Sequence, residues 1–116
     1  MTEISDVRTL DFVQVARRSE VSTDRPKKIV CQGREIALFR VEDQIYATQN
    51  SCTHSYASLA DGDTDDAVVV CPLHSACFDV RTGHVLRGPA RLPLVTYEVR
   101  VVGEWIQVGL PQDAIA

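Results

Sequence analysis

Short runs of hydrophobic residues alternate with turn residues along most of the chain. The clearest pattern lies at residues 97–101, where Tyr97, Val99 and Val101 alternate with two charged residues. A period of two is typical of a strand with one face in water.

The same criteria indicate eight or nine short strands, within residues 12–16, 28–31, 35–41, 44–48, 68–70, 78–80, 84–86, 97–101 and 105–108. Helix signals are almost absent, apart from one turn at residues 56–60. Strands of this length and spacing predict an all-β fold, a small antiparallel sandwich or barrel.

Length and composition indicate one globular domain spanning residues 1–116. The chain has a mass of 12.8 kDa and 45% hydrophobic residues, both ordinary for a single domain. No apolar run approaches the roughly 20 residues that cross a bilayer, and the first ten residues lack a signal-peptide pattern. We therefore expect a cytoplasmic protein without a membrane partner.

The net charge of −4 and pI near 5.2 argue against a nucleic-acid partner, which would require a basic face. The acidic residues are densest at Asp61, Asp63, Asp65 and Asp66. They are interpreted either as a solvated loop tip or as a negative rim that steers docking onto a basic partner.

Two short motifs carry the candidate chemistry. Cys52-Thr53-His54 and Cys71-Pro72-Leu73-His74 each supply one thiolate and one imidazole, and both fall between predicted strands. Two Cys and two His can hold one tetrahedral zinc or a two-iron cluster with unlike ends. The Cys-x-His and Cys-x-x-His order favours the cluster, because zinc fingers normally pair Cys with Cys and His with His.

The remaining cysteines and histidine have no predicted role in metal binding. Cys31 lies in an apolar run and is interpreted as a small buried hydrophobe. Cys77, three residues after His74, is a packing residue, a replacement ligand or a reactive thiol. His84 stands alone after a turn and is expected at or near the surface.

Together with residues 78–83 and 88–90, these motifs give the chain a resemblance to the Rieske-type [2Fe-2S] ferredoxins of bacterial aromatic-ring-hydroxylating dioxygenase systems. The resemblance implies that Cys52 and Cys71 bind one iron and that His54 and His74 bind the other. It also implies an all-β fold with a cluster-binding end formed by two ligand loops. Pro89 would belong to a third loop that covers the cluster.

Six residues are expected to surround the cluster or shield it from water: Ser55, Leu59, Leu73, Ser75, Phe78 and Pro89. Tyr56, Leu59 and Leu73 are also candidates for a docking patch.

The resemblance implies a one-electron carrier and not an enzyme. Such a protein takes electrons from an NAD(P)H-dependent flavoprotein reductase and passes them to a terminal oxygenase that hydroxylates an aromatic substrate. The chain has three histidines; with two on the cluster, it cannot build the oxygenase's own mononuclear iron site. It also lacks a dinucleotide-binding Gly-x-Gly-x-x-Gly motif. We expect a monomer.

Four alternatives remain open. The chain could be the small subunit of a nitrite-reductase-like assembly, or a ferredoxin for a cytochrome-type monooxygenase. It could also be a redox sensor that switches through Cys77, or a zinc-stabilised structural domain.

Departures from the family pattern bear on the potential. Ala57 and Leu73 stand where the respiratory branch carries a disulfide, and Ala76 and Phe78 stand where it carries hydroxyl donors. Fewer donors to the sulfurs lower the reduction potential, which favours the dioxygenase type.

The residues that follow the two ligand histidines also depart from the pattern, because Ser55 and Ser75 replace the usual glycines. Three interpretations are open for these serines. The backbone reaches each position without positive φ, or the position is strained, or the serine hydroxyl donates a hydrogen bond to a cluster sulfur.

Overall fold

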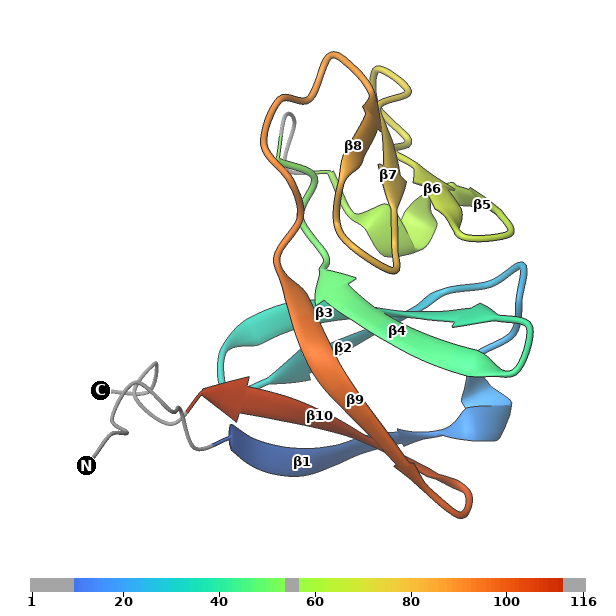
Figure 1. Cartoon of the computed structure of the whole chain (residues 1–116), viewed down its shortest axis with the longest axis vertical. Helices are drawn as coiled ribbons and strands as arrows, with labels where there is room; N and C mark the ends of the chain where they lie inside the picture. The colour runs from blue at the N-terminus through green and yellow to red at the C-terminus, as the bar shows by residue number, and fades with distance from the viewer. Residues whose placement is uncertain (1–9, 54–56, 112–116) are drawn as a thin grey trace.

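The computed structural model describes residues 10–53 and 57–111. These ranges form two antiparallel sheets and two single-turn 3-10 helices (Figure 1). The larger sheet contains six strands: β1 (Leu10–Arg17), β2 (Lys27–Cys31), β3 (Arg34–Val41), β4 (Gln44–Gln49), β9 (Thr96–Val102) and β10 (Trp105–Pro111). The smaller sheet contains four: β5 (Asp63–Asp65), β6 (Val68–Val70), β7 (Cys77–Asp79) and β8 (Val85–Arg87).

The strand order is β1-β10-β9-β4-β3-β2 in the larger sheet and β5-β6-β7-β8 in the smaller. The larger sheet curls so that its edge strands β1 and β2 come near each other, and the smaller sheet stands at one end of it (Figure 1). The helices η1 (Arg18–Glu20) and η2 (Leu59–Asp61) are short connections. The predicted all-β antiparallel fold is confirmed.

Turn residues explain the β2–β3 hairpin. Gln32 and Gly33 both have positive φ, 53° and 77°, and Cys31 pairs directly with Arg34. Two residues of positive φ match the twist of the flanking strands. The expected turn at these residues is therefore confirmed.

Strand β3 joins the two halves of the molecule, because both of its faces are buried. Ile36 and Leu38 pack inside the curled sheet with residues of β10, whereas Ala37 and Phe39 pack in a second core with the smaller sheet. Successive side chains of a strand point to opposite faces. A strand covered on both sides therefore carries a continuous apolar run.

The prediction of a loop tip at the acidic cluster was wrong for residues 63–65. These residues form β5, which pairs with β6 and leaves Asp63 and Asp65 exposed on either side of Thr64. Three polar residues carry no hydrophobic alternation, so only the pairing partner reveals the strand. Outward carboxylates on an edge strand also discourage pairing with another chain.

Two smaller differences concern strand ends. β8 begins at Val85, so His84 lies in the turn before it and not in a strand. In β9 the predicted alternation holds for Tyr97 and Val99 but fails at Val101, which is 41% exposed.

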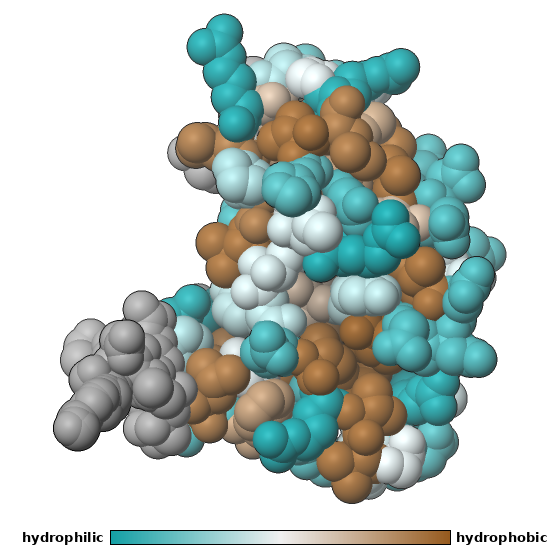
Figure 2. All heavy atoms as spheres, in the orientation of Figure 1, coloured by the Kyte–Doolittle hydropathy of each residue, from teal (hydrophilic) through white to brown (hydrophobic). Residues whose placement is uncertain are grey.

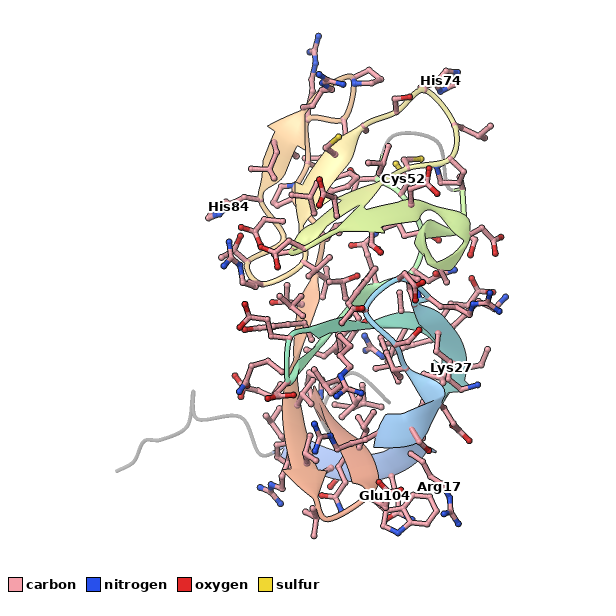
Figure 3. The ribbon with its side chains drawn as sticks, turned by 90° about the vertical axis from the view of Figure 1, so that its right-hand side faces the viewer. Arg17, Lys27, Cys52, His74, His84 and Glu104 are labelled. Atoms are coloured by element: carbon pink, nitrogen blue, oxygen red, sulfur yellow. The ribbon has the colours of Figure 1, made fainter. Side chains whose placement is uncertain are left out.

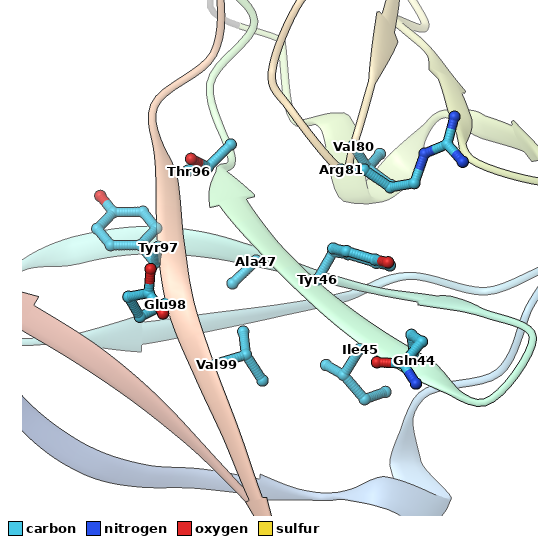
Figure 4. Close-up of a pocket in the computed structure, with 10 residues that line it drawn as sticks. All are labelled: Gln44, Ile45, Tyr46, Ala47, Val80, Arg81, Thr96, Tyr97, Glu98 and Val99. Atoms are coloured by element: carbon cyan, nitrogen blue, oxygen red, sulfur yellow. The ribbon is translucent and has the colours of Figure 1, made fainter.

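A groove of about 360 Å³ separates the two sheets on one side (Figure 4). Strands β4 and β9 form one wall, and the β7–β8 turn with Val80 and Arg81 forms the other. None of the helices in residues 10–53 and 57–111 has the length and hydrophobicity that a membrane span needs.

Candidate metal centre

Two loops of equal length stand at the outer end of the smaller sheet. Residues 52–57 are closed by a hydrogen bond from the Cys52 N–H to the Ala57 carbonyl, at 2.9 Å. Residues 71–76 are closed in the same way by Cys71 and Ala76, at 2.7 Å. Each loop is bracketed by an antiparallel pair of residues, one immediately before it and one immediately after it. The two motifs of the sequence therefore begin at equivalent hydrogen bonds and lie between equivalent flanking pairs.

The ligand candidates divide by burial. The thiols of Cys52 and Cys71 are buried, 0% and 1% exposed, within the core of the smaller sheet. The His74 side chain is exposed. Figure 3 shows Cys52 and His74 at the same end of the molecule. This places sulfur on the inner side and an imidazole on the outer side.

Three predicted site residues, His54, Ser55 and Tyr56, lie outside the described residues. Of the others, Leu59 and Phe78 are fully buried in the same core as Cys52 and Cys71. Leu73 and Pro89 are exposed at the surface. The residues expected around the cluster thus form two groups, one beneath the ligand loops and one on the outer surface.

Ser75 has φ of 61°, and His74 before it has φ of 67°. Both lie in the left-handed region, which costs a non-glycine residue about 1 kcal/mol or more. The option that residue 75 avoids positive φ is therefore wrong, and the loop carries backbone strain at Ser75.

Sequence reasoning missed Asn50, two residues before Cys52. Its side chain is 1% exposed, donates from Nδ2 to Ser58 Oγ at 2.9 Å and accepts from the Ala60 N–H at 3.0 Å. Its backbone carbonyl accepts from the Leu59 N–H at 2.8 Å. Asn50 therefore fixes the end of the first ligand loop against its beginning. The only signal in the sequence is a polar residue at a strand end beside a ligand.

Two more polar side chains join the first ligand loop to the third loop, residues 87–95. Thr53 Oγ1 donates to the Leu92 carbonyl at 2.7 Å. Gln49 accepts from the Val95 N–H at 2.8 Å and donates to the Ser51 carbonyl at 2.7 Å. These bonds hold the loop that contains Pro89 beside the first ligand loop.

The β7–β8 turn supports the third loop from the other side. The Leu94 N–H donates to the Gly83 carbonyl at 2.8 Å, and a Cβ at residue 83 would collide with the Leu94 carbonyl oxygen. Gly83 also has φ of 83°. Only glycine fits this conformation and close approach.

An ion pair shapes the same turn. Arg81 donates from Nε and Nη2 to the two oxygens of Asp79, each at 3.2 Å, and its backbone N–H donates to Oδ1 at 2.9 Å. These hydrogen bonds hold the pKa of the Asp79 carboxyl below its ordinary value, although burial opposes the shift.

Cys31 and His84 lie as the sequence predicted. Cys31 is buried, and Cys77 is partly buried with its Sγ 3.6 Å from the Ser75 carbonyl oxygen. His84 is exposed and lies away from the two ligand loops (Figure 3).

The residues present fit a two-iron cluster with unlike ends. Two buried thiolates would offset the positive charge of the irons inside the protein, and neutral imidazoles suit the outer side. A binuclear cluster divides its four ligands between two irons, so it requires only two around each.

Comparison with known proteins gives the same assignment. The pattern of the Rieske [2Fe-2S] domain matches residues 11–98. The ferredoxin component of the naphthalene 1,2-dioxygenase system of Pseudomonas putida is 33% identical over 102 residues, 88% of this chain and 98% of that protein.

Two solved structures are similar in fold. The Sphingomonas yanoikuyae B1 ferredoxin has a TM-score of 0.83 at 27% identity, over 87% of this chain and all of that one. A chain from the complex of reduced oxygenase and oxidized ferredoxin in carbazole 1,9a-dioxygenase has a TM-score of 0.79 at 35% identity, over 84% of this chain and 91% of that one.

The chain therefore belongs to the Rieske [2Fe-2S] domain family. Its cofactor is one [2Fe-2S] cluster of the Rieske type, and its role is that of a ferredoxin, which carries electrons and catalyses no reaction of its own. The resemblance drawn from the two Cys/His motifs is confirmed.

Proposed function

We propose that this ferredoxin passes electrons, one at a time, from an NAD(P)H-dependent flavoprotein reductase to a terminal oxygenase that hydroxylates an aromatic substrate. The observation that carries the proposal is the pair of ligand segments closed by equivalent hydrogen bonds, with the thiols of Cys52 and Cys71 buried on the inner side and the imidazole of His74 exposed on the outer side. When bound, the cluster accepts and releases one electron.

Each ligand has a separate task in this proposal. Cys52 and Cys71 hold one iron as thiolates in the core, while His54 and His74 hold the other as neutral imidazoles. Replacing two thiolates by imidazoles raises the potential above that of an all-cysteine cluster. The exposed imidazole side is the natural exit for the electron.

The rest of the chain keeps the ligands in place. Leu59 and Phe78 exclude water beneath the loops, and Thr53, Gln49 and Asn50 hold the loops together through hydrogen bonds. A rigid frame keeps the ligand geometry similar in both redox states. That similarity lowers the reorganisation cost of electron transfer.

The partners are proposed from the relatives. One structural neighbour was solved in complex with its oxygenase, and the naphthalene relative belongs to a dioxygenase system. In this role the protein is a cytoplasmic monomer that meets its reductase and its oxygenase in turn. The contacts should be small, below about 1,200 Å², because both complexes must separate quickly.

A coupled assay tests the proposal. NADH, a flavoprotein reductase from an aromatic-ring dioxygenase system, this protein and cytochrome c are mixed, and cytochrome c reduction is followed. We expect reduction to require catalytic amounts of this protein. His74→Ala should abolish it, whereas the matched variant His84→Ala should not. If His84→Ala abolished transfer and His74→Ala did not, the ligand assignment would be wrong.

A further inference from the structure

The three loops at the cluster end differ in charge from the rest of the chain. Residues 52–57, 71–76 and 87–95 contain no Asp or Glu but include Arg87 and Arg91. The whole chain has 12 basic and 16 acidic residues. With these two arginines set aside, ten basic and all sixteen acidic residues lie elsewhere. The cluster end is therefore basic on an acidic protein.

The second and third loops and strand β8 also carry exposed apolar side chains. Leu73, Leu86 and Leu92 are 51%, 54% and 64% exposed. Figure 2 shows hydrophobic surface at this end of the molecule, with hydrophilic side chains standing out beyond it. An apolar centre with a charged rim is typical of a transient protein interface.

Both arginines lie beside the predicted ligands. Arg87 on β8 pairs across the sheet with Cys77, which follows the second ligand loop. Arg91 lines a shallow hollow of about 610 Å³ together with Thr53, Pro89 and Leu92. This hollow thus joins the first ligand loop to the third loop.

The two guanidinium groups are available for a partner. Among residues 10–53 and 57–111, no ion pair involves Arg87 or Arg91, whereas Arg40 and Arg81 pair with nearby aspartates at 3.6 and 3.2 Å. Both arginines are exposed. Their charge therefore projects into solvent without an internal counter-charge.

Asp79, on the neighbouring strand β7, is paired with Arg81. The other acidic residues in the strands of the smaller sheet lie on β5, at its opposite edge. Asp63, Val70, Cys77 and Arg87 form one row across the four strands. At about 4.8 Å per strand, Asp63 and Arg87 lie roughly 14 Å apart. Asp65 is further along β5, where it lines a separate hollow with other acidic residues. The surface therefore has an acidic edge at β5 and a basic edge at β8 and the third loop.

We propose that the basic edge, Arg87 and Arg91 with the exposed Leu73, Leu86 and Leu92, is a docking surface for an electron-transfer partner that presents carboxylates around an apolar patch. This inference rests on the proposed function, because it assumes that electrons leave at this end. It differs from the interpretation of the acidic cluster as the steering rim. The net negative charge of the whole protein repels a partner that carries carboxylates, but the two arginines attract it locally. The charges near the point of electron exit therefore govern how the partner approaches and how it is oriented.

A small anionic oxidant tests the local charge without a protein partner. Ferricyanide takes one electron from the reduced protein and becomes ferrocyanide, and stopped-flow absorption follows the rate at ionic strengths of about 0.01 to 0.2 M. For the wild type we expect the rate to fall as salt is added. Arg87→Gln with Arg91→Gln should lower the low-salt rate roughly tenfold and remove that salt dependence.

The matched control is Arg17→Gln with Lys27→Gln. It makes the same change in net charge, but both residues lie in the half of the molecule away from His74 (Figure 3). We expect its low-salt rate to change less than twofold. Equal effects of the two double variants, or a wild-type rate that rises with salt, would overturn the proposal.

A second readout needs no electron transfer. Chromium hexacyanide, a paramagnetic trianion, should broaden the amide NMR signals of the third loop and β8 in the oxidised protein, and Arg87→Gln with Arg91→Gln should abolish the broadening. Broadening of signals elsewhere in the protein would contradict the docking assignment. So would self-association at higher protein concentration that covers this surface and prevents the broadening. Failure of the proposed function is distinguishable, because the coupled assay with the flavoprotein reductase would then fail while ferricyanide still oxidised the chemically reduced protein.

Discussion

Asn50 shows how one buried amide can support a metal centre although it is not one of the predicted metal ligands. Both ends of its side chain and its backbone carbonyl bind the segment that follows the first ligand loop. A hydrophobic replacement would leave the Ala60 N–H and the Ser58 hydroxyl without these partners. Unsatisfied buried groups are costly.

Asn50→Ala is therefore expected to lower the free energy of unfolding by about 2 to 3 kcal/mol and to speed cluster loss. Urea unfolding and the decay of cluster absorption measure these effects. Gln44→Ala, at an exposed amide on β4, the strand that ends just before Asn50, should change stability by no more than about 0.5 kcal/mol. Equal effects of the two variants would refute the role of Asn50.

The strain at Ser75 gives a second prediction. Ser75→Gly removes the penalty of positive φ and should leave stability unchanged or raise it, whereas Ser75→Val should lower it by about 1 to 2 kcal/mol. The midpoint potential of Ser75→Gly also tests the hydroxyl. If the hydroxyl donates to a cluster sulfur, the potential falls; an unchanged potential ends that interpretation.

The Asp79–Arg81 pair makes stability depend on pH. The pKa of Asp79 is lower in the folded than in the unfolded chain, so the pair stabilises the fold above the ordinary Asp pKa. That contribution is lost as the pH falls through the lowered value. Arg81→Gln should therefore lose less stability than the wild type between neutral pH and pH about 3.

Urea unfolding at both pH values checks this prediction, with Arg40→Gln as the control. Arg40 also pairs with an aspartate, but Asp43 is 89% exposed, so solvent screens the interaction. Arg40→Gln should behave like the wild type. An acid loss in Arg81→Gln as large as that of the wild type would contradict the account.

At the scale of elements, the third loop depends on contacts that reach far along the chain. It is held by Gln49 and Thr53 on one side and by Gly83 on the other. Because these contacts converge, a change in the β7–β8 turn should reach the metal centre.

Gly83→Ala is expected to cost about 2 to 3 kcal/mol, since the added Cβ meets the Leu94 carbonyl at a positive φ. Gly103→Ala shares the positive φ but has open space around it, so about 1 kcal/mol is expected. Thermal unfolding compares the two, and cluster loss should be faster only in Gly83→Ala. The reverse order would contradict the proposed support of the third loop.

The elements that sequence reasoning predicted are those with local signals. β2, β3 and their Gln32–Gly33 turn follow from neighbouring residues, and the two ligand motifs follow from short spacings. β5 and the roles of Gln49, Asn50 and Thr53 did not follow. The three side chains form hydrogen bonds with residues 8 to 46 positions away, and β5 is defined by its pairing with β6. No pattern among the neighbouring residues predicts these contacts.

At the scale of the whole molecule, the larger sheet provides a stable base and the smaller sheet provides the metal-binding end. The curled six-stranded sheet forms one core, and the four-stranded sheet presents the ligand loops from a second core that shares β3. Net charge did not reveal the basic docking edge, because it sums the charges of the whole chain. Only the fold shows that Arg87 and Arg91 lie at the opposite edge of the smaller sheet from the acidic residues of β5.

The most direct test of the central claim is metal and sulfide analysis combined with EPR on anaerobically purified, dithionite-reduced protein. We expect a brown protein with two irons and two acid-labile sulfides per chain, as a [2Fe-2S] centre requires. Reduction should give a rhombic signal with a low average g, and both Cys52→Ser and His74→Ala should remove it. A colourless protein that carries stoichiometric zinc and no sulfide would contradict the account.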